Sequence, residues 1–224
     1  MNEQKAETLN AQGIEELNEG NVEKAIEYFL EAIKQDEKNP YPYCHIGNIL
    51  SASQQAEESI RWFDKAVELD QDMATAYYGK GSALYNLEKW DEAIEMYQHA
   101  ENKGLEDADL YYMLGMANKN KGEGHESVSL AYFQRAVDLN PEDVEAIFER
   151  GLCSAYIGHL EHAKKDFEYV VAHQEEHADA YYNLGVVYMH EENREKALAQ
   201  FQKAIDIQPN HVLALHAKKL IEGE

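Results

Sequence analysis

The stretch Tyr181-Tyr-Asn-Leu-Gly185-Val-Val-Tyr188 is followed at short intervals by Ala197, Phe201, Ala204 and Pro209. Its glycine has counterparts along the whole chain, at Gly13, Gly47, Gly81, Gly115, Gly151 and Gly185. These glycines are 34 residues apart, except for one interval of 36 residues. Self-similarity at this period is the sequence signature of a stacked helical array. The sequence therefore predicts a repeat protein in which each unit packs against its neighbours.

Three further positions recur behind each glycine: a small residue, an aromatic residue four positions later, and a second small or branched residue. They are Ala25, Ser59, Ala93, Ser129, Ala163 and Ala197; Phe29, Phe63, Tyr97, Phe133, Phe167 and Phe201; and Ala32, Ala66, Ala100, Ala136, Val170 and Ala204. The apolar spacing predicts two antiparallel helices per unit, for example over 74–86 and about 91–103. The glycine and the first small residue lack bulk, so the paired helices can approach closely beside the ring.

Residues at the expected helix ends support this division. Asn21 and Asn193 are predicted N-caps of second helices, and Gly104 is a predicted C-terminal cap. Pro141 and Pro209 lie where the chain must leave one helix and begin another. The predicted repeats are 6–39, 40–73, 74–107, 108–143, 144–177 and 178–211.

The fourth repeat contains the two additional residues. Its segment 119–126 is polar and rich in glycine, which favours a longer turn between the paired helices. A local change in superhelical twist is the alternative interpretation. Beyond the last repeat, residues 211–221 predict a capping helix with one polar face. In that helix we expect Val212, Leu213, Leu215 and Leu220 to face inward, and Lys218 and Lys219 to face outward.

These motifs resemble the tetratricopeptide repeat family over essentially the whole chain. The resemblance implies an all-α, right-handed superhelical solenoid of six helix pairs with a C-terminal capping helix, and a single domain over 1–224. It also implies a scaffold for protein–protein interaction. Gln54 replaces the usual glycine between helices, and Glu37 and Glu175 replace the usual proline. Segments 74–79 and 177–220 also resemble, more closely, the small stand-alone family members of Bacillus-type bacteria. That likeness implies a cytoplasmic adaptor with a peptide-binding groove, near RNA-modification enzymes.

The charge of the chain bears on the partner. Acidic residues outnumber basic residues 43 to 20, and the formal net charge is −23. This balance disfavours nucleic acid and anionic membranes and favours a neutral, basic or apolar protein segment. Segment 1–13 lacks the apolar stretch of a secretory signal, and no apolar run is long enough to span a bilayer. We therefore expect a cytoplasmic protein with Cys44 and Cys153 as free thiols, and no cofactor or metal.

A candidate binding surface follows from the helix geometry. Positions five, nine and twelve of each first helix lie about 100° away from the residues that contact the second helix, so we expect them outside that interface. In a stacked array they line a shared concave surface. The candidate residues, called here the first-helix face, are Asn10, Asn48, Tyr78, Ser82, Tyr85, Tyr112, Met116, Lys119, Phe148, Leu152, Tyr182 and Val186. Ile14, Leu17, Cys44, Ser51, Ala155 and Met189 occupy equivalent positions.

Aromatic residues at position five and the scarcity of cations characterise this face. Tyrosine offers contact area and a hydroxyl group to a bound peptide. The alternative is that the rings only pack between adjacent first helices. Lys119 is the one clear cation of the face. The lysine-rich clamp by which some family members hold acidic C-terminal peptides is therefore absent, because Tyr78 and Ser82 occupy its third-repeat positions.

Acidic residues at the second position of the first helices allow two interpretations. Glu7, Asp109, Glu145 and Asp179 would attract a basic peptide, or they would only compensate helix dipoles. The first interpretation favours a basic partner, and the second carries no information on the partner.

Catalysis is not expected. His173-Gln-Glu-Glu-His177 matches the spelling of a zinc-peptidase motif, but it straddles the joint between two repeats, where a continuous helix should end. His159 and His162 have the spacing for adventitious metal binding. Besides an interaction scaffold, the open alternatives are a homo-oligomeric structural protein and an adaptor in an RNA-modification assembly without direct RNA binding. Direct RNA binding would require a basic groove.

Overall fold

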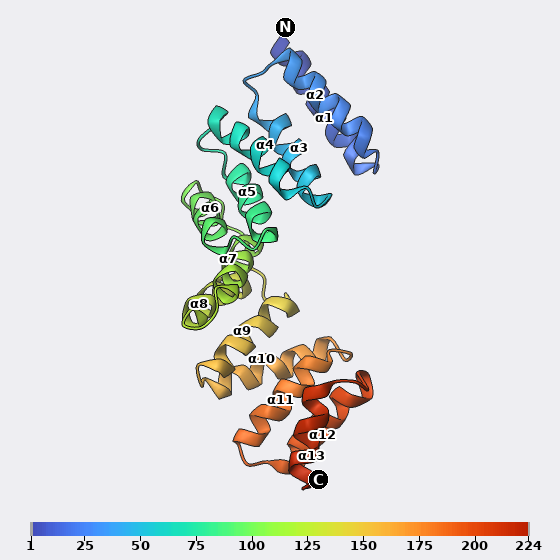
Figure 1. Cartoon of the computed structure of the whole chain (residues 1–224), viewed down its shortest axis with the longest axis vertical. Coiled ribbons are helices and arrows are strands. Elements are labelled where there is room, and N and C mark those ends of the chain that lie inside the picture. Colours follow the sequence, from blue (N-terminus) through green and yellow to red (C-terminus); the bar gives the residue numbers. More distant parts are fainter. Residues whose placement is uncertain (1, 224) are drawn as a thin grey trace. The chain divides into compact units, whose positions relative to one another are not determined.

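The computed structural model describes residues 2–223, and within them it contains thirteen α-helices and no strand (Figure 1). The helices are α1 (Asn2–Asn18), α2 (Val22–Gln35), α3 (Pro40–Ala52), α4 (Ala56–Leu69), α5 (Ala74–Asn86), α6 (Trp90–Asn102), α7 (Ala108–Asn120), α8 (Glu126–Leu139), α9 (Val144–Tyr156), α10 (Leu160–His173), α11 (Ala178–His190), α12 (Arg194–Ile207) and α13 (Val212–Glu222). The predicted all-α repeat fold of six helix pairs and a C-terminal helix is confirmed.

The helices form two compact units. The N-terminal unit, Met1–Glu106, contains α1 to α6, and the C-terminal unit, Asp107–Glu224, contains α7 to α13. Within each unit the two helices of a repeat pack on each other, and a second helix also contacts the first helix that follows it. In addition, α3 contacts α5 and α9 contacts α11. The continuous right-handed solenoid over 1–224 stays a prediction.

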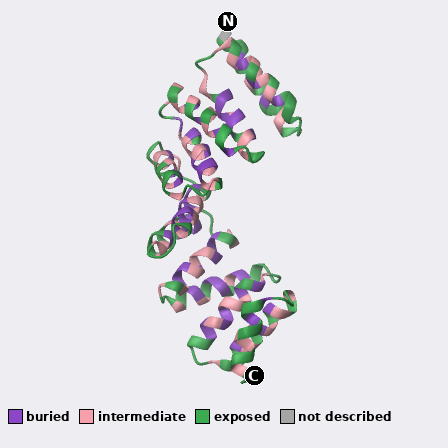
Figure 2. Ribbon diagram, in the orientation of Figure 1, coloured by how far each residue is buried: buried purple, intermediate pink, exposed green. Residues whose placement is uncertain are grey.

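The glycine and the aromatic residue of each repeat meet as the sequence pattern predicts. A Cβ atom on Gly115 would lie 2.7 Å from Cε1 of Phe133, and one on Gly185 would lie 2.6 Å from Cε1 of Phe201. All six aromatic residues of the pattern are buried, as are the small residues that flank them. Figure 2 shows that buried positions recur along the helices of both units. The core is therefore a series of ring-against-glycine contacts, one for each repeat.

The predicted helix ends are confirmed in part. The side chain of Asn193 accepts a hydrogen bond from the backbone N–H of Lys196, at 3.1 Å, and caps α12. Asn21 precedes α2, but it makes no capping bond, because its amide group donates to Glu16 instead, at 2.9 Å. Gly104 follows α6 with φ +91°, which is the left-handed conformation expected of a helix stop.

The turn in the fourth repeat is longer, as predicted. It occupies residues 121–125, whereas the equivalent turn of the third repeat occupies residues 87–89. Gly122 and Gly124 in this turn both have left-handed φ angles. The two additional residues are thus absorbed between α7 and α8.

The short turns place one residue in the left-handed region whether or not it is glycine. Gly20 and Gly158 supply it in two repeats, whereas Gln54, Glu88 and Glu192 have φ of 60°, 59° and 57°. A residue with a Cβ atom is strained in this conformation. Gln54, which stands where glycine is usual, therefore lowers the local stability of the turn but leaves the fold unchanged.

Replacing Glu88 with glycine is expected to raise the free energy of unfolding by about 1 kcal/mol, because it relieves the strain of the left-handed residue. Urea denaturation followed by circular dichroism would measure the change. The control is Glu57→Gly in the exposed first turn of α4, which should instead lower stability. A loss of stability in Glu88→Gly would contradict the interpretation.

The terminal helix departs from the prediction. Val212, Leu213 and Leu220 were expected to face inward, yet they are 74%, 57% and 67% exposed. Only Ala214 of α13 is buried, and α13 packs on α12. Within residues 2–223 no second helix follows α13 to cover its other sides, so apolar side chains remain at the surface.

Of the other three residues of α13 for which the sequence predicts an orientation, only one lies as predicted. Lys219 is exposed, as predicted, and Lys218 is half-buried with Nζ donating to Gln202 at 2.8 Å. Leu215 is 36% exposed and does not face inward. The helix therefore does not present a simple polar cap to solvent.

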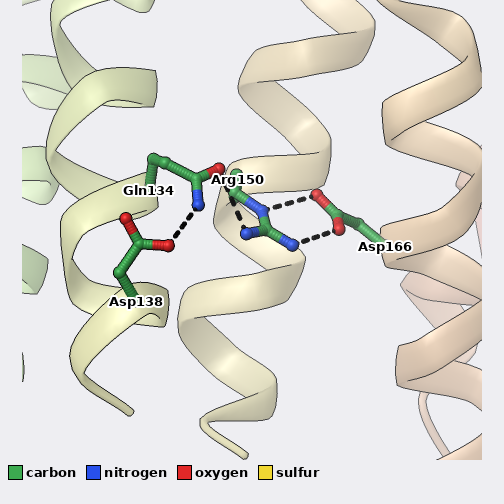
Figure 3. A network of polar contacts seen from close by, with 4 residues as sticks. All are labelled: Gln134, Asp138, Arg150 and Asp166. Carbon is green, nitrogen blue, oxygen red and sulfur yellow. Dashed lines mark hydrogen bonds and ion pairs between the residues drawn. The ribbon is translucent and has the colours of Figure 1, made fainter. Parts of the chain in front are cut away.

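A polar network, of which Asp166 is the buried member, ties the fourth and fifth repeats together within the C-terminal unit (Figure 3). Arg150 on α9 donates from Nε and Nη2 to the Asp166 carboxylate on α10, at 2.9 Å and 2.5 Å. Its Nη1 donates to Gln134 on α8 at 3.2 Å, and Gln134 donates to Asp138 at 2.7 Å. One guanidinium group therefore bridges the second helices of consecutive repeats.

Candidate functional site

The aromatic residues at position five lie against the core of their own repeats. The ring centroids are 5.6 to 5.9 Å apart for the pairs Tyr78–Tyr97, Tyr112–Phe133, Phe148–Phe167 and Tyr182–Phe201. The expectation that position five lies outside the interface between paired helices was therefore wrong. A tyrosine ring is long enough to reach the buried aromatic residue from a position about 100° round the helix. The tyrosines remain half-buried, and each contributes both to packing and to the surface.

Two of these rings also touch the histidine that precedes the next first helix. The ring of His177 lies 4.4 Å from that of Phe148, and His211 lies 5.2 Å from Tyr182. Phe148 is consequently only 9% exposed, whereas Tyr182 stays half-buried. Both histidines cap helices, because Nδ1 of His177 accepts from Ala180 and Nδ1 of His211 accepts from Ala214. The repeat pattern does not indicate that these histidines support the face.

The aliphatic members of the face in the C-terminal unit are accessible. Met116 on α7, Leu152 on α9 and Val186 on α11 are all half-buried. Tyr112 on α7 and Tyr182 on α11 are half-buried as well, so the accessible positions of the predicted face in this unit are apolar or aromatic with a hydroxyl group. Such a composition suits the binding of protein side chains.

The one cation of the predicted face is paired. Nζ of Lys119 on α7 donates to a carboxylate oxygen of Glu149 on α9, and the Glu149 side chain is 12% exposed. The charge of Lys119 is therefore largely neutralised within the unit. Glu149 could not be identified as the partner of Lys119 from the repeat pattern, because the two residues are in different repeats. Glu145 and Asp179 remain exposed at the second positions of α9 and α11, so the surroundings of this face are acidic.

The candidate residues of the N-terminal unit form a more polar group. Ser82 and Tyr85 are half-buried; the Tyr97 hydroxyl donates to Ser82 Oγ at 3.3 Å, and Tyr85 packs edge-on against Trp90 at 4.9 Å. Asn48 is exposed. Asn10 is half-buried, and its Oδ1 has no hydrogen-bond partner in the part of the chain that the structure describes.

A pocket of about 320 Å³ opens in the C-terminal unit beside Val186. It is lined by Val186, Met189, His190, Arg194, Phe201, Ala217, Leu220 and Ile221, from α11, α12 and α13. Val186 and Met189 occupy positions of the predicted first-helix face, and Phe201 is the recurring aromatic residue of the sixth repeat. The others could not be found from the sequence, because the pocket exists only where α13 meets α11 and α12.

The histidine motif is divided between two helices, as expected. His173 ends α10, and its Nδ1 lies 2.8 Å from the carbonyl oxygen of Tyr169, whereas His177 precedes α11. The rings of His159 and His162 are 6.1 Å apart. Among residues 2–223, no group of three or more His, Cys, Asp or Glu side chains is placed to hold a metal ion.

Both cysteines are free and buried, at 3% exposure for Cys44 and 4% for Cys153. Burial disfavours the thiolate and raises the pKa of each thiol to about 11. Neither thiol is therefore activated for nucleophilic chemistry at neutral pH.

We expect both thiols to react with iodoacetamide at pH 8 roughly 100-fold more slowly than in the unfolded chain, because a raised pKa lowers the thiolate fraction. Mass spectrometry after timed quenching, with and without urea, would measure the two rates for each cysteine. Equal rates in the folded and unfolded protein would show that the thiols are accessible and ionised.

Family models described as tetratricopeptide repeat match residues 6–39, 78–123, 122–182 and 178–211, and one described as TPR repeat matches residues 47–88. Among curated proteins the comparison found no match. No helix within residues 2–223 combines the length and the apolar character needed to cross a membrane.

Solved structures give the same result. YrrB, described as a TPR protein with an unusual peptide-binding site, is 45% identical, with a TM-score of 0.80 over 85% of this chain and 97% of that chain. PilF of Pseudomonas aeruginosa has a TM-score of 0.81 at 14% identity, covering 98% of this chain and 99% of its own. MamA has a TM-score of 0.70 at 22% identity, covering 77% and 93%. The last two likenesses concern the fold alone, whereas the family models and YrrB show that this chain belongs to the tetratricopeptide repeat family.

Proposed function

We propose that this protein is an interaction scaffold that binds a segment of a partner protein on the part of the first-helix face that lies in the C-terminal unit. The observation that carries the proposal is the set of half-buried tyrosine and aliphatic side chains on α7, α9 and α11, whose one lysine is already paired with Glu149. Tetratricopeptide repeat proteins are interaction scaffolds, and YrrB is described as having a peptide-binding site. Both facts support the proposal.

The surroundings of the face indicate the chemistry of the partner. Glu145 and Asp179 are exposed beside it, and the net charge of the chain is −23. A segment that alternates apolar residues with lysine or arginine would bury its apolar side chains on the face and pair its cations at the edge. We further propose that the protein acts without catalysis, and in the cytoplasm, where the free thiols of Cys44 and Cys153 would persist.

The test uses peptides selected from a random library on the full chain, with affinities measured by fluorescence anisotropy. Tyr182→Ala is expected to weaken binding about tenfold, because aromatic anchors dominate such interfaces. Tyr28→Ala on the second helix α2 is the matched control and should leave affinity unchanged. Selected peptides that bind Tyr182→Ala and Tyr112→Ala as well as the wild type would remove the face from consideration.

The alternative is a homo-oligomer. The exposed Val212 and Leu213 of α13 favour it, because apolar side chains grouped on a surface commonly mark an interface. Light scattering at several protein concentrations, on the wild type and on Val212→Ser/Leu213→Ser, would decide. A mass that stays monomeric at every concentration would exclude this alternative.

A further inference from the structure

The pocket between α11, α12 and α13 has an apolar interior and contains side chains that are unusually exposed. Phe201 closes it from α12, Val186 and Met189 line it from α11, and Leu220 lines it from α13. Leu220 is 67% exposed and Met189 is 37% exposed. Covering apolar side chains of this kind is favourable in water. The volume of about 320 Å³ suits one or two large side chains, and it is too small for a helix.

The charge of this pocket is opposite to that of the protein. Arg194 and His190 are its ionisable residues, and no carboxylate lines it. Another pocket of the same unit is instead lined by Glu175, Glu176 and Asp179. The rest of this acidic protein would repel an anionic ligand. The pocket, which contains a cation and no carboxylate, would instead attract one.

The Arg194 side chain is available for such a group. It is exposed in the first turn of α12, and within residues 2–223 it forms no hydrogen bond or ion pair. Lys164, by contrast, is held by Glu191 at 2.8 Å. A guanidinium group can receive a carboxylate through two parallel N–H donors.

We propose that this pocket binds the C-terminal residue of the partner polypeptide, with its apolar side chain in the pocket and its α-carboxylate on Arg194. An apolar group and a carboxylate on neighbouring atoms match the two features that the pocket combines. The inference rests on the proposed function and extends it, because Val186 belongs both to the pocket and to the first-helix face. The preceding basic residues of the partner would then lie toward Asp179 and Glu145.

The experiment compares three labelled peptides that share a body of alternating lysine and apolar residues. One ends in leucine with a free carboxylate, one ends in leucine amide, and one ends in serine with a free carboxylate. We expect the first to bind the full chain about tenfold more tightly than either of the others. Arg194→Glu should remove the advantage of the carboxylate over the amide, and Arg194→Lys should retain part of it.

Two substitutions on α13 provide a matched pair. Leu220→Ser should weaken the peptide ending in leucine about tenfold, whereas Leu213→Ser should have no effect, because Leu213 is similarly exposed but does not line the pocket. Equal binding of the carboxylate and the amide would overturn the inference while leaving the proposed function intact. Equal effects of the two leucine substitutions would also overturn it.

If none of the peptides binds, the proposed function fails in this assay, and the pocket is tested on its own. N-acetyl-leucine, N-acetyl-leucinamide and decanoate are titrated into the full chain and followed by amide chemical shifts. Shifts at Val186, Met189 and Leu220 with N-acetyl-leucine alone support the inference. Unshifted resonances, or a response to decanoate that exceeds the response to N-acetyl-leucine, overturn it, the latter in favour of a fatty acid.

Discussion

Replacing Phe133 with alanine is expected to lower the free energy of unfolding by about 3–5 kcal/mol, one of the two largest effects predicted for this protein. The Phe133 ring is completely buried between α7 and α8, with the backbone of Gly115 on one side. Its removal opens a cavity that neighbouring helices cannot close without losing their register. Urea denaturation followed by circular dichroism would measure the loss.

The ring and the glycine should act as one unit, and a double-mutant cycle tests this. In the wild type, Gly115→Ala places a Cβ atom 2.7 Å from Cε1 of Phe133, so the ring must shift, and we expect a loss of roughly 1–3 kcal/mol. In the Phe133→Ala background the space is free. The same substitution should then stabilise the protein by up to about 1 kcal/mol, since alanine favours helices more than glycine does.

The sign of the Gly115→Ala effect is therefore the decisive observation. A loss of the same size in both backgrounds would show that the glycine serves backbone conformation rather than ring packing. Phe133→Leu keeps most of the apolar volume and should lose less than Phe133→Ala. It provides a folded variant for the cycle if the alanine variant is too unstable.

The repeats could be predicted from the sequence because their signals are local. A helix such as α5 is set by the apolar spacing of residues 74–86, and the structure places it at Ala74–Asn86. The close contact of Gly81 with Tyr97 follows from residue volume alone, because only a residue without a side chain fits against a buried ring. These inferences required no knowledge of which repeats are neighbours in space.

What could not be predicted depends on contacts between repeats. Lys119 looked like a free cation until the structure placed Glu149 beside it. The exposure of Leu220, and the pocket that it forms near Arg194, depend on how α13 packs at the end of the unit. The sequence period says which residues of a helix are equivalent, but it does not say what lies opposite each of them.

The second large effect is expected at the buried ion pair of Arg150 and Asp166. Asp166→Ala should lower the free energy of unfolding by roughly 3 kcal/mol, because it leaves a mostly buried guanidinium group without its anion. The Asp166 side chain is 8% exposed and that of Arg150 is 19% exposed. Gln134 alone, at 3.2 Å from Nη1, cannot compensate for the lost charge.

The N-terminal unit offers a more exposed ion pair as the control for this prediction. Lys80 occupies in the third repeat the position that Arg150 occupies in the fifth, and it donates to Asp64 at 2.6 Å. The Asp64 side chain is 53% exposed, so the pair is screened by water. Asp64→Ala should therefore change stability by no more than about 1 kcal/mol.

The double variant Arg150→Met/Asp166→Leu removes both charges. It therefore distinguishes the destabilisation caused by an unpaired charge from the net contribution of the ion pair to stability. An apolar pair of similar volume often replaces a buried ion pair without loss, so the double variant should be more stable than Asp166→Ala alone. Denaturation in urea, which leaves charge interactions unscreened, would rank the three proteins. If Asp166→Ala and Asp64→Ala proved equally mild, water must reach Arg150 freely, and the bridge between α8 and α10 would contribute no more than a surface contact.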